Sequence, residues 1–217
     1  MKRIFFIILT GVFVFQINAQ INEPGKFYVT PKVGYNMANI TLLDKYGADP
    51  RHGINAGIAF GYAINEMISI EPGVFYSMQG SAFKIGKVKF GLNNDYLAVP
   101  VFFKAYLIEG LHLYAGPQFS YLLSSQFKVK TGLRFLDDVI NIVSKNLDLS
   151  KYENKFDVSL AVGLGYQFAN GFNISANYNF GVSKVPKFED FKWGNETFSL
   201  DINAKNSLLQ LNIGYRF

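Results

Sequence analysis

Residues 156–168 read FDVSLAVGLGYQF, a stretch that alternates between large apolar side chains and small or polar ones. The first set of positions holds Phe156, Val158, Leu160, Val162, Leu164, Tyr166 and Phe168. The positions between them hold Asp157, Ser159, Ala161, Gly163, Gly165 and Gln167. A period of two residues indicates a β-strand. The stretch is longer than the about 5–6 residues of an ordinary strand and is long enough to cross a bilayer at a tilt.

The same alternation recurs at 172–182 and at 209–217, where Asn, Ser, Gln and Gly separate the apolar residues. A soluble barrel would place its large apolar side chains inside. Here the small and polar side chains form the enclosed face, which fits lipid outside and a polar lumen inside. Weaker versions of the pattern predict five further strands, at 26–40, 53–64, 67–78, 95–107 and 111–123.

The predicted connections alternate between short and long. Short turns fall at 65–66, 109–110 and 169–171, whereas long connections cover 41–52, 79–94, 124–155 and 184–206. This wiring predicts an all-β fold, an eight-stranded antiparallel transmembrane β-barrel with short periplasmic turns and long extracellular loops. A closed barrel leaves no unpaired backbone edge in lipid. A ten-stranded barrel is the alternative if 184–206 adds two strands.

Composition supports a membrane barrel. The chain has 217 residues and is 49% hydrophobic and 17% aromatic, with 17% charged residues and no cysteine. These values exclude intrinsic disorder and a disulfide scaffold. Residues 4–15 form the one long apolar run, and at that length they are too short for a spanning helix.

That apolar run has the layout of a secretory signal peptide. Lys2 and Arg3 precede it, and 16–19 close it on the small residue Ala19. We therefore expect cleavage after Ala19, which makes 1–19 the signal peptide and 20–217 one barrel domain. A retained anchor helix is the alternative. Export of the mature chain also argues against nucleic acid as a partner, despite the net charge of +5.

Four motifs add a family resemblance. They are TPKVGYN at 30–36, IEPGVFYSMQG at 70–80, YLAVPVFFK at 96–104 and YAGPQ at 114–118. In this order they resemble the PorT-like outer-membrane β-barrel family. The resemblance implies the fold and an outer-membrane location. It leaves the function open, because a fold hosts many functions. One member of that family belongs to a secretion system, so a secretion component is one alternative.

Five charged residues are predicted to face the lumen. An eight-stranded barrel has an interior just wide enough to be filled by side chains, and an isolated buried charge is costly. We therefore expect these charges to form a lumen network, with one another or with trapped water. A narrow ion or proton path is the alternative. The five are Lys32, Glu71, Lys104, Asp157 and Arg216.

Six basic residues fall in the predicted extracellular loops and suggest contact with the phosphates of lipopolysaccharide. They are Lys84, Lys87, Lys89, Lys128, Lys130 and Arg134. Ordinary solvated loop charge is the alternative. Apolar residues between 136 and 147 follow helical spacing and predict a short amphipathic helix in the longest loop.

The C-terminal Phe217 continues the outward apolar pattern of its strand. Its position resembles the signal by which the barrel-assembly machinery recognises its substrates, so we expect that machinery to be a partner during insertion.

Signals for catalysis are weak. The chain has two histidines, His52 and His112, and neither belongs to a nucleophile motif. We expect a non-catalytic, monomeric protein with a structural or surface-interaction role, in contact with outer-membrane lipids and without cofactor or metal. The alternatives are a narrow channel or secretion component and, third, a lipid-modifying enzyme that uses His52. The sequence does not identify a protein partner.

Overall fold

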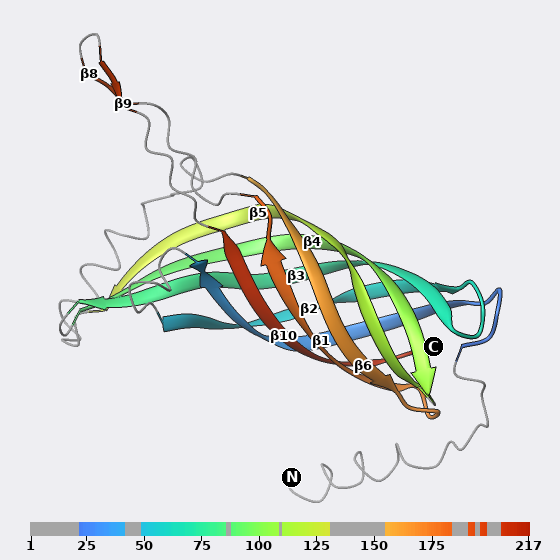
Figure 1. Ribbon diagram of the computed structural model, residues 1–217. Coiled ribbons are helices and arrows are strands. Elements are labelled where there is room, and N and C mark those ends of the chain that lie inside the picture. Colours follow the sequence, from blue (N-terminus) through green and yellow to red (C-terminus); the bar gives the residue numbers. More distant parts are fainter. Residues whose placement is uncertain are drawn as a thin grey trace, which may run out of the picture.

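The computed structural model describes residues 22–41, 49–85, 88–108, 110–130, 155–183, 191–193, 196–198 and 205–217. Its main body is a closed antiparallel β-barrel (Figure 1). The barrel strands are β1 (Phe27–Ile40), β2 (Asp49–Ala63), β3 (Ile68–Ile85), β4 (Val88–Ile108), β5 (Leu111–Lys130), β6 (Phe156–Gln167), β7 (Phe172–Gly181) and β10 (Asn206–Tyr215).

Each barrel strand pairs with its neighbour in the chain, and β1 pairs with β10 to close the ring. The predicted fold of eight antiparallel strands is therefore confirmed. The short strands β8 (Phe191–Trp193) and β9 (Glu196–Phe198) form a separate two-stranded sheet. The ten-stranded alternative is wrong, because this hairpin does not enter the barrel.

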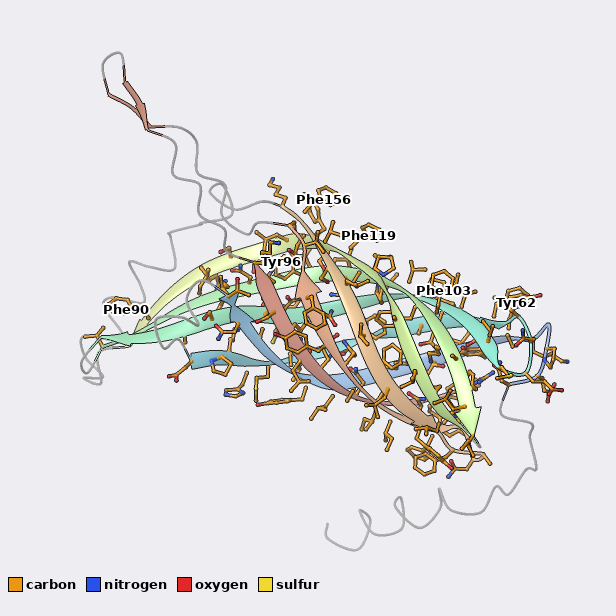
Figure 2. All side chains as sticks on the ribbon, in the orientation of Figure 1. Tyr62, Phe90, Tyr96, Phe103, Phe119 and Phe156 are labelled. Carbon is orange, nitrogen blue, oxygen red and sulfur yellow. The ribbon has the colours of Figure 1, made fainter. Side chains whose placement is uncertain are left out.

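The two faces of the barrel wall differ as the alternation predicts. Phe103 and Phe119 point away from the barrel and expose about half of their surface, whereas Tyr96 lies inside and exposes 1% (Figure 2). Along β6, Leu164 is 55% exposed and Gln167 is 4% exposed. Large apolar groups on an exposed surface are stable where the surroundings are hydrocarbon. Within the described ranges, no helix is long and apolar enough to cross a membrane.

The strands differ greatly in length. β3, β4 and β5 have 18, 21 and 20 residues, whereas β6, β7 and β10 have 12, 10 and 10. The expectation that 79–94 is a loop is wrong, since β3 and β4 pair continuously from Gln79↔Asn94 to Ile85↔Val88. β5 likewise continues to Lys130. In these segments the apolar residues Val88, Phe90 and Leu92 of β4 share the face of the buried Asn94, so the apolar-out pattern no longer holds.

Gly80 marks the point where β3 leaves the apolar band. Its φ of +135° is a conformation that side chains disfavour, and a Cβ there would lie 2.0 Å from the carbonyl oxygen of Leu92. The missing side chain also leaves room for Arg51, whose guanidinium reaches across β3 from β2. There it donates to the backbone oxygens of Gln79 and Asn94. Glycine is thus required where three strands pass together out of the membrane.

Candidate functional site

The lower lumen, toward the short turns, contains an ion triad. Glu71 on β3 lies between two lysines: its Oε1 is 2.5 Å from Nζ of Lys32 on β1, and its Oε2 is 2.6 Å from Nζ of Lys104 on β4. The side chains of Lys32, Glu71 and Lys104 expose 9%, 1% and 4% of their surface. Both carboxylate oxygens hold an ammonium group, so the buried carboxylate is fully paired.

Neighbouring strands leave the room that the triad needs. Lys32 faces Gly57 on β2 and Gly214 on β10 in the register. A Cβ at Gly214 would lie 2.8 Å from Cγ of Lys32. On the other side, Lys104 pairs with Ser69 and is therefore the diagonal neighbour of Glu71. Residues on diagonal positions come close enough for long side chains to interact.

The other two predicted lumen charges contact aromatic and hydroxyl groups. The guanidinium carbon of Arg216 lies 3.6 Å from the ring centre of Tyr28, and its Nη1 donates to the hydroxyl of Tyr106 at 3.3 Å. Such cation–π contacts stabilise a half-buried guanidinium. Asp157, at the outer end of β6, accepts a hydrogen bond of 2.7 Å from Ser183. Direct ion pairs thus join Lys32, Glu71 and Lys104.

Above the triad, a belt of amides fills the middle of the lumen. Asn36 accepts from Asn55 at 2.7 Å and from Gln210 at 3.0 Å, and Gln210 accepts from Asn177 at 3.0 Å. Asn179 continues the belt by donating to Gln118 at 2.9 Å. These six amide side chains come from β1, β2, β5, β7 and β10, and each exposes 8% or less of its surface.

Little space remains in the lumen beside the belt. A cavity of about 30 Å³ separates it from the triad, which is room for one or two water molecules. Farther out, the buried side chains of Tyr96, Leu122 and Leu208 occupy the interior. The amide belt was not recognised in the sequence, although Asn, Gln and Ser at inward positions of neighbouring strands were its signal. Which amides share a level depends on strand register, which a single strand does not reveal.

The histidines occupy opposite environments. His112 is fully buried at the lower end of the lumen, where Nδ1 lies 3.0 Å from the carbonyl oxygen of Gly110 and the ring packs near Tyr106. His52 is exposed on the outward face of β2, and its Nδ1 pairs with the hydroxyl of Tyr35. Arg51, the residue before His52, forms an ion pair with Asp95 at 3.2 Å. Within the part of the chain described, no cluster suited to a metal ion occurs.

Four of the six basic residues predicted to contact lipopolysaccharide lie in the described strands, where the backbone pairing fixes their positions. Lys84 on β3 lies directly opposite Lys89 on β4, which lies directly opposite Lys130 on β5. Lys128 pairs with Gly91, two residues along the same strands. Directly opposed residues share one face of a sheet, so three lysine positions form a row across the projecting strands. Lys87 and Arg134 lie outside the described residues, as do the predicted signal peptide and the predicted helix near 136–147.

Phe217 extends the pairing between β10 and β1. Its backbone N–H donates to the carbonyl oxygen of Val29 at 2.9 Å, and its carbonyl accepts from Val29 at 3.3 Å. The side chain remains 75% exposed. An exposed aromatic at this end of the outward face is the arrangement that the expected assembly signal requires.

Comparisons with known proteins agree with the barrel. The model of the outer membrane protein beta-barrel domain family matches residues 18–186. A search of the curated proteins gives no match.

Solved structures that match this chain include the following three proteins. Ail of Yersinia pestis is 15% identical with a TM-score of 0.45, over 89% of this chain and 99% of Ail. Neisserial surface protein A is 16% identical with a TM-score of 0.45, over 88% of this chain and 97% of that protein. OprG of Pseudomonas aeruginosa is 10% identical with a TM-score of 0.41, over 92% and 99%.

Proposed function

This chain belongs to the outer membrane protein beta-barrel domain family, and from that premise we propose that it is a non-catalytic surface-interaction protein. It resides in the outer membrane. In our proposal, the sealed barrel anchors a projecting sheet, defined as residues 79–85 of β3, 88–96 of β4 and 122–130 of β5. The extra length of these three strands is the observation that carries the proposal.

The length of β4 determines how far the projecting sheet extends from the membrane. The outward apolar series of β4 ends at Leu97, and the strand begins at Val88. At about 3.3 Å of rise per residue and a tilt of about 45°, the intervening segment rises about 21 Å above the apolar band. The headgroup region on each side of a bilayer is only about 5–8 Å thick. The sheet therefore reaches beyond the headgroups, to where soluble or cell-surface molecules can meet it.

We further propose that the lysine row, Lys84, Lys89 and Lys130, binds the phosphates of lipopolysaccharide. Like charges at directly opposed positions destabilise a sheet. A bound polyanion removes that repulsion, and the three positions lie directly opposite one another in the register. Lys128 lies beside the row, and Lys87 and Arg134 extend the basic set in sequence.

The test is binding of a phosphorylated core oligosaccharide that carries no acyl chains. We expect the Lys84→Gln, Lys89→Gln and Lys130→Gln triple variant to lose most of the binding, and replacement of all six basic residues also to reduce lipopolysaccharide co-purification. The matched control replaces Lys145, Lys151 and Lys155 by Gln, which removes the same charge from sequence positions outside the row. Equal loss in both triple variants would refute a site at the row.

The filled lumen supports an anchor over a channel. The buried side chains of the amide belt and of Tyr96, Leu122 and Leu208 occupy the lumen, which supports a barrel without a continuous water path. We therefore expect no steady conductance from the full mature protein in planar bilayers. Reproducible single-channel steps that vary with ion type would support transport instead.

Three narrower parts of the proposal concern the family, insertion into the membrane and the oligomeric state. The four motifs support PorT-like membership, for which a secretion operon beside the gene is the decisive observation. Phe217 supports recognition by the barrel-assembly machinery, and its replacement by Ser should slow insertion into the membrane. The closed ring of eight strands, which needs no strand from a second chain, supports a monomer.

A further inference from the structure

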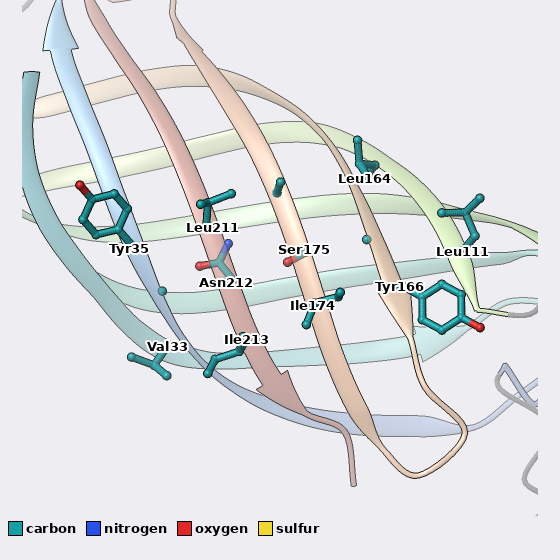
Figure 3. Close-up of a pocket in the computed structure, with 13 residues that line it drawn as sticks. Val33, Tyr35, Leu111, Leu164, Tyr166, Ile174, Ser175, Leu211, Asn212 and Ile213 are labelled. Atoms are coloured by element: carbon teal, nitrogen blue, oxygen red, sulfur yellow. The ribbon is translucent and has the colours of Figure 1, made fainter.

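The outward face of the barrel is hollowed on one side. A groove of about 590 Å³ runs across β1, β10, β7 and β6 (Figure 3). A second hollow of about 290 Å³ adjoins it and shares Val33 and Ile213. Figure 3 shows Leu164, Leu211 and Ile174 around the groove, with Tyr35 at one end and Tyr166 and Leu111 toward the other.

The hollow has a simple cause in the sequence. Ala176 is a small outward residue of β7, and its cross-strand partners are the larger Leu164 on β6 and Leu211 on β10. Along the strand, Ile174 and Tyr178 lie two residues to either side. A methyl group among these longer side chains leaves a depression in a surface that faces hydrocarbon.

One end of this apolar groove is polar. Tyr35, which lines the groove, pairs through its hydroxyl with Nδ1 of the exposed His52. The two rings stack with their centroids 5.8 Å apart. When the tyrosine hydroxyl donates to Nδ1, the ring proton of His52 lies on Nε2 and is available to an external acceptor. Phosphate oxygens are acceptors of this kind.

The polar end lies near the outer membrane surface. Phe27 begins β1 at the end with the short turns. With about 3.3 Å of rise per residue and a tilt of about 45°, Tyr35 stands roughly 19 Å above it. The apolar band spans about 25 Å, so Tyr35 and His52 lie close to the outer-leaflet headgroups. The groove runs inward from there, in the direction taken by the acyl chains of an outer-leaflet lipid.

We propose that this groove is a binding site for one lipid A molecule. An acyl chain lies over Ala176, and a glucosamine phosphate accepts a hydrogen bond from Nε2 of His52. A second copy of the chain is a poorer occupant. A two-fold contact would set the same concave patch against itself and leave both hollows unfilled.

The site is separate from the projecting sheet. It is formed by β1, β10, β7 and β6 with His52 of β2 and Leu111 at the turn end of β5, whereas the lysine row lies on β3, β4 and the opposite end of β5. The acyl-free oligosaccharide used for the row cannot occupy the groove. The two proposals therefore succeed or fail independently.

The experiment is a titration of the mature protein in detergent micelles, followed by native mass spectrometry. The probes are bis-phosphorylated lipid A, dephosphorylated lipid A and phosphatidylethanolamine. Ala176→Phe fills the groove and should weaken binding of both forms of lipid A about tenfold. The matched control is Ala105→Phe, because Ala105 is also outward, lies between Ile68 and Leu113 in the register and does not line the groove.

His52→Ala tests the headgroup contact. It should weaken binding of the bis-phosphorylated form about tenfold, as expected for a hydrogen bond to a charged group, and leave the dephosphorylated form unchanged. Heat-modifiable gel migration verifies folding of each variant, and Ala176→Leu replaces Ala176→Phe if the latter does not fold. Equal behaviour of the two phenylalanine variants, stronger binding of phosphatidylethanolamine than of lipid A, or a groove-dependent mass of two chains would each overturn the proposal.

Discussion

The lower lumen and the projecting sheet both contain lysines, but the two regions stabilise them differently. In the lumen, Lys32 and Lys104 share one carboxylate, and each lies within 2.6 Å of a Glu71 oxygen. In the sheet, Lys84, Lys89 and Lys130 face one another in register. Lysines can adjoin without an acid where water screens them, whereas a buried lysine needs a counter-charge.

This comparison predicts that the energetic effect of a substitution falls from the lower lumen to the tip of the sheet. Four substitutions sample that path, and each can be measured by urea unfolding of the mature protein in lipid vesicles.

Glu71→Gln should have the largest effect. It leaves two buried ammonium groups without their counter-charge, and we expect a loss of about 3–5 kcal/mol in the free energy of unfolding. The control replaces Lys32, Glu71 and Lys104 together by Met, which should remain near wild-type stability because no buried charge is left. If Glu71→Gln alone were as stable as the wild type, water would have to reach the triad.

Asn177→Ala should have the next largest effect. Asn177 donates to Gln210 at 3.0 Å and to Asn179 at 2.5 Å, and it accepts from Tyr114 at 3.1 Å. Its loss leaves buried polar groups without partners, at about 1–3 kcal/mol. Asn170→Ala, in the exposed turn before β7, is the control. Equal losses of unfolding free energy in the two variants would mean that the amide belt stabilises the barrel no more than the exposed turn does.

Ser183→Ala should have a smaller effect at the outer mouth. Its hydroxyl donates to Asp157 at 2.7 Å and accepts from the backbone of Val158 at 2.8 Å. We expect a loss of about 0.5–1.5 kcal/mol, the net value of a hydrogen bond with access to water. Ser183→Thr keeps the hydroxyl and should restore most of the stability. A loss as large as that of Asn177→Ala would contradict the gradient.

The triple replacement of Lys84, Lys89 and Lys130 by Gln should have the smallest effect, with the opposite sign. Relief of cross-strand repulsion should raise stability by less than about 1 kcal/mol, and added salt should abolish the difference. Replacement of Lys145, Lys151 and Lys155 serves again as the control. A loss of stability at any salt concentration would show that the row has acidic neighbours.

The same contrast explains what could be predicted from the sequence. Where lipid lies outside and a polar lumen inside, Leu160, Val162 and Leu164 alternate sharply with Ser159, Ala161 and Gly163, and the strand is evident. In the projecting sheet, Phe83, Lys84 and Ile85 alternate too, but only over a few residues before Gly86 and Lys87. The signal there is short, and its apolar residues do not continue the outward series of the membrane strands.

The site was less predictable than the fold for a different reason. Lys32, Glu71 and Lys104 could each be placed inside the barrel from alternation alone. Their grouping into a triad depends on the register between strands and on strand tilt. These are properties of pairs of strands, and a one-residue change in register moves a side chain to the other face.

The pairing of β1 with β10 has a consequence for the order of folding. Val33 pairs with Ile213, so the seam joins residues separated by most of the chain, whereas each of the other pairings joins barrel strands that follow one another in the sequence. Contacts of such long sequence separation carry the largest loop-closure entropy and form late. We infer that hairpins assemble first and that β1 keeps a free backbone edge until β10 arrives. Closure of this one seam would then be the event that commits the chain to the bilayer.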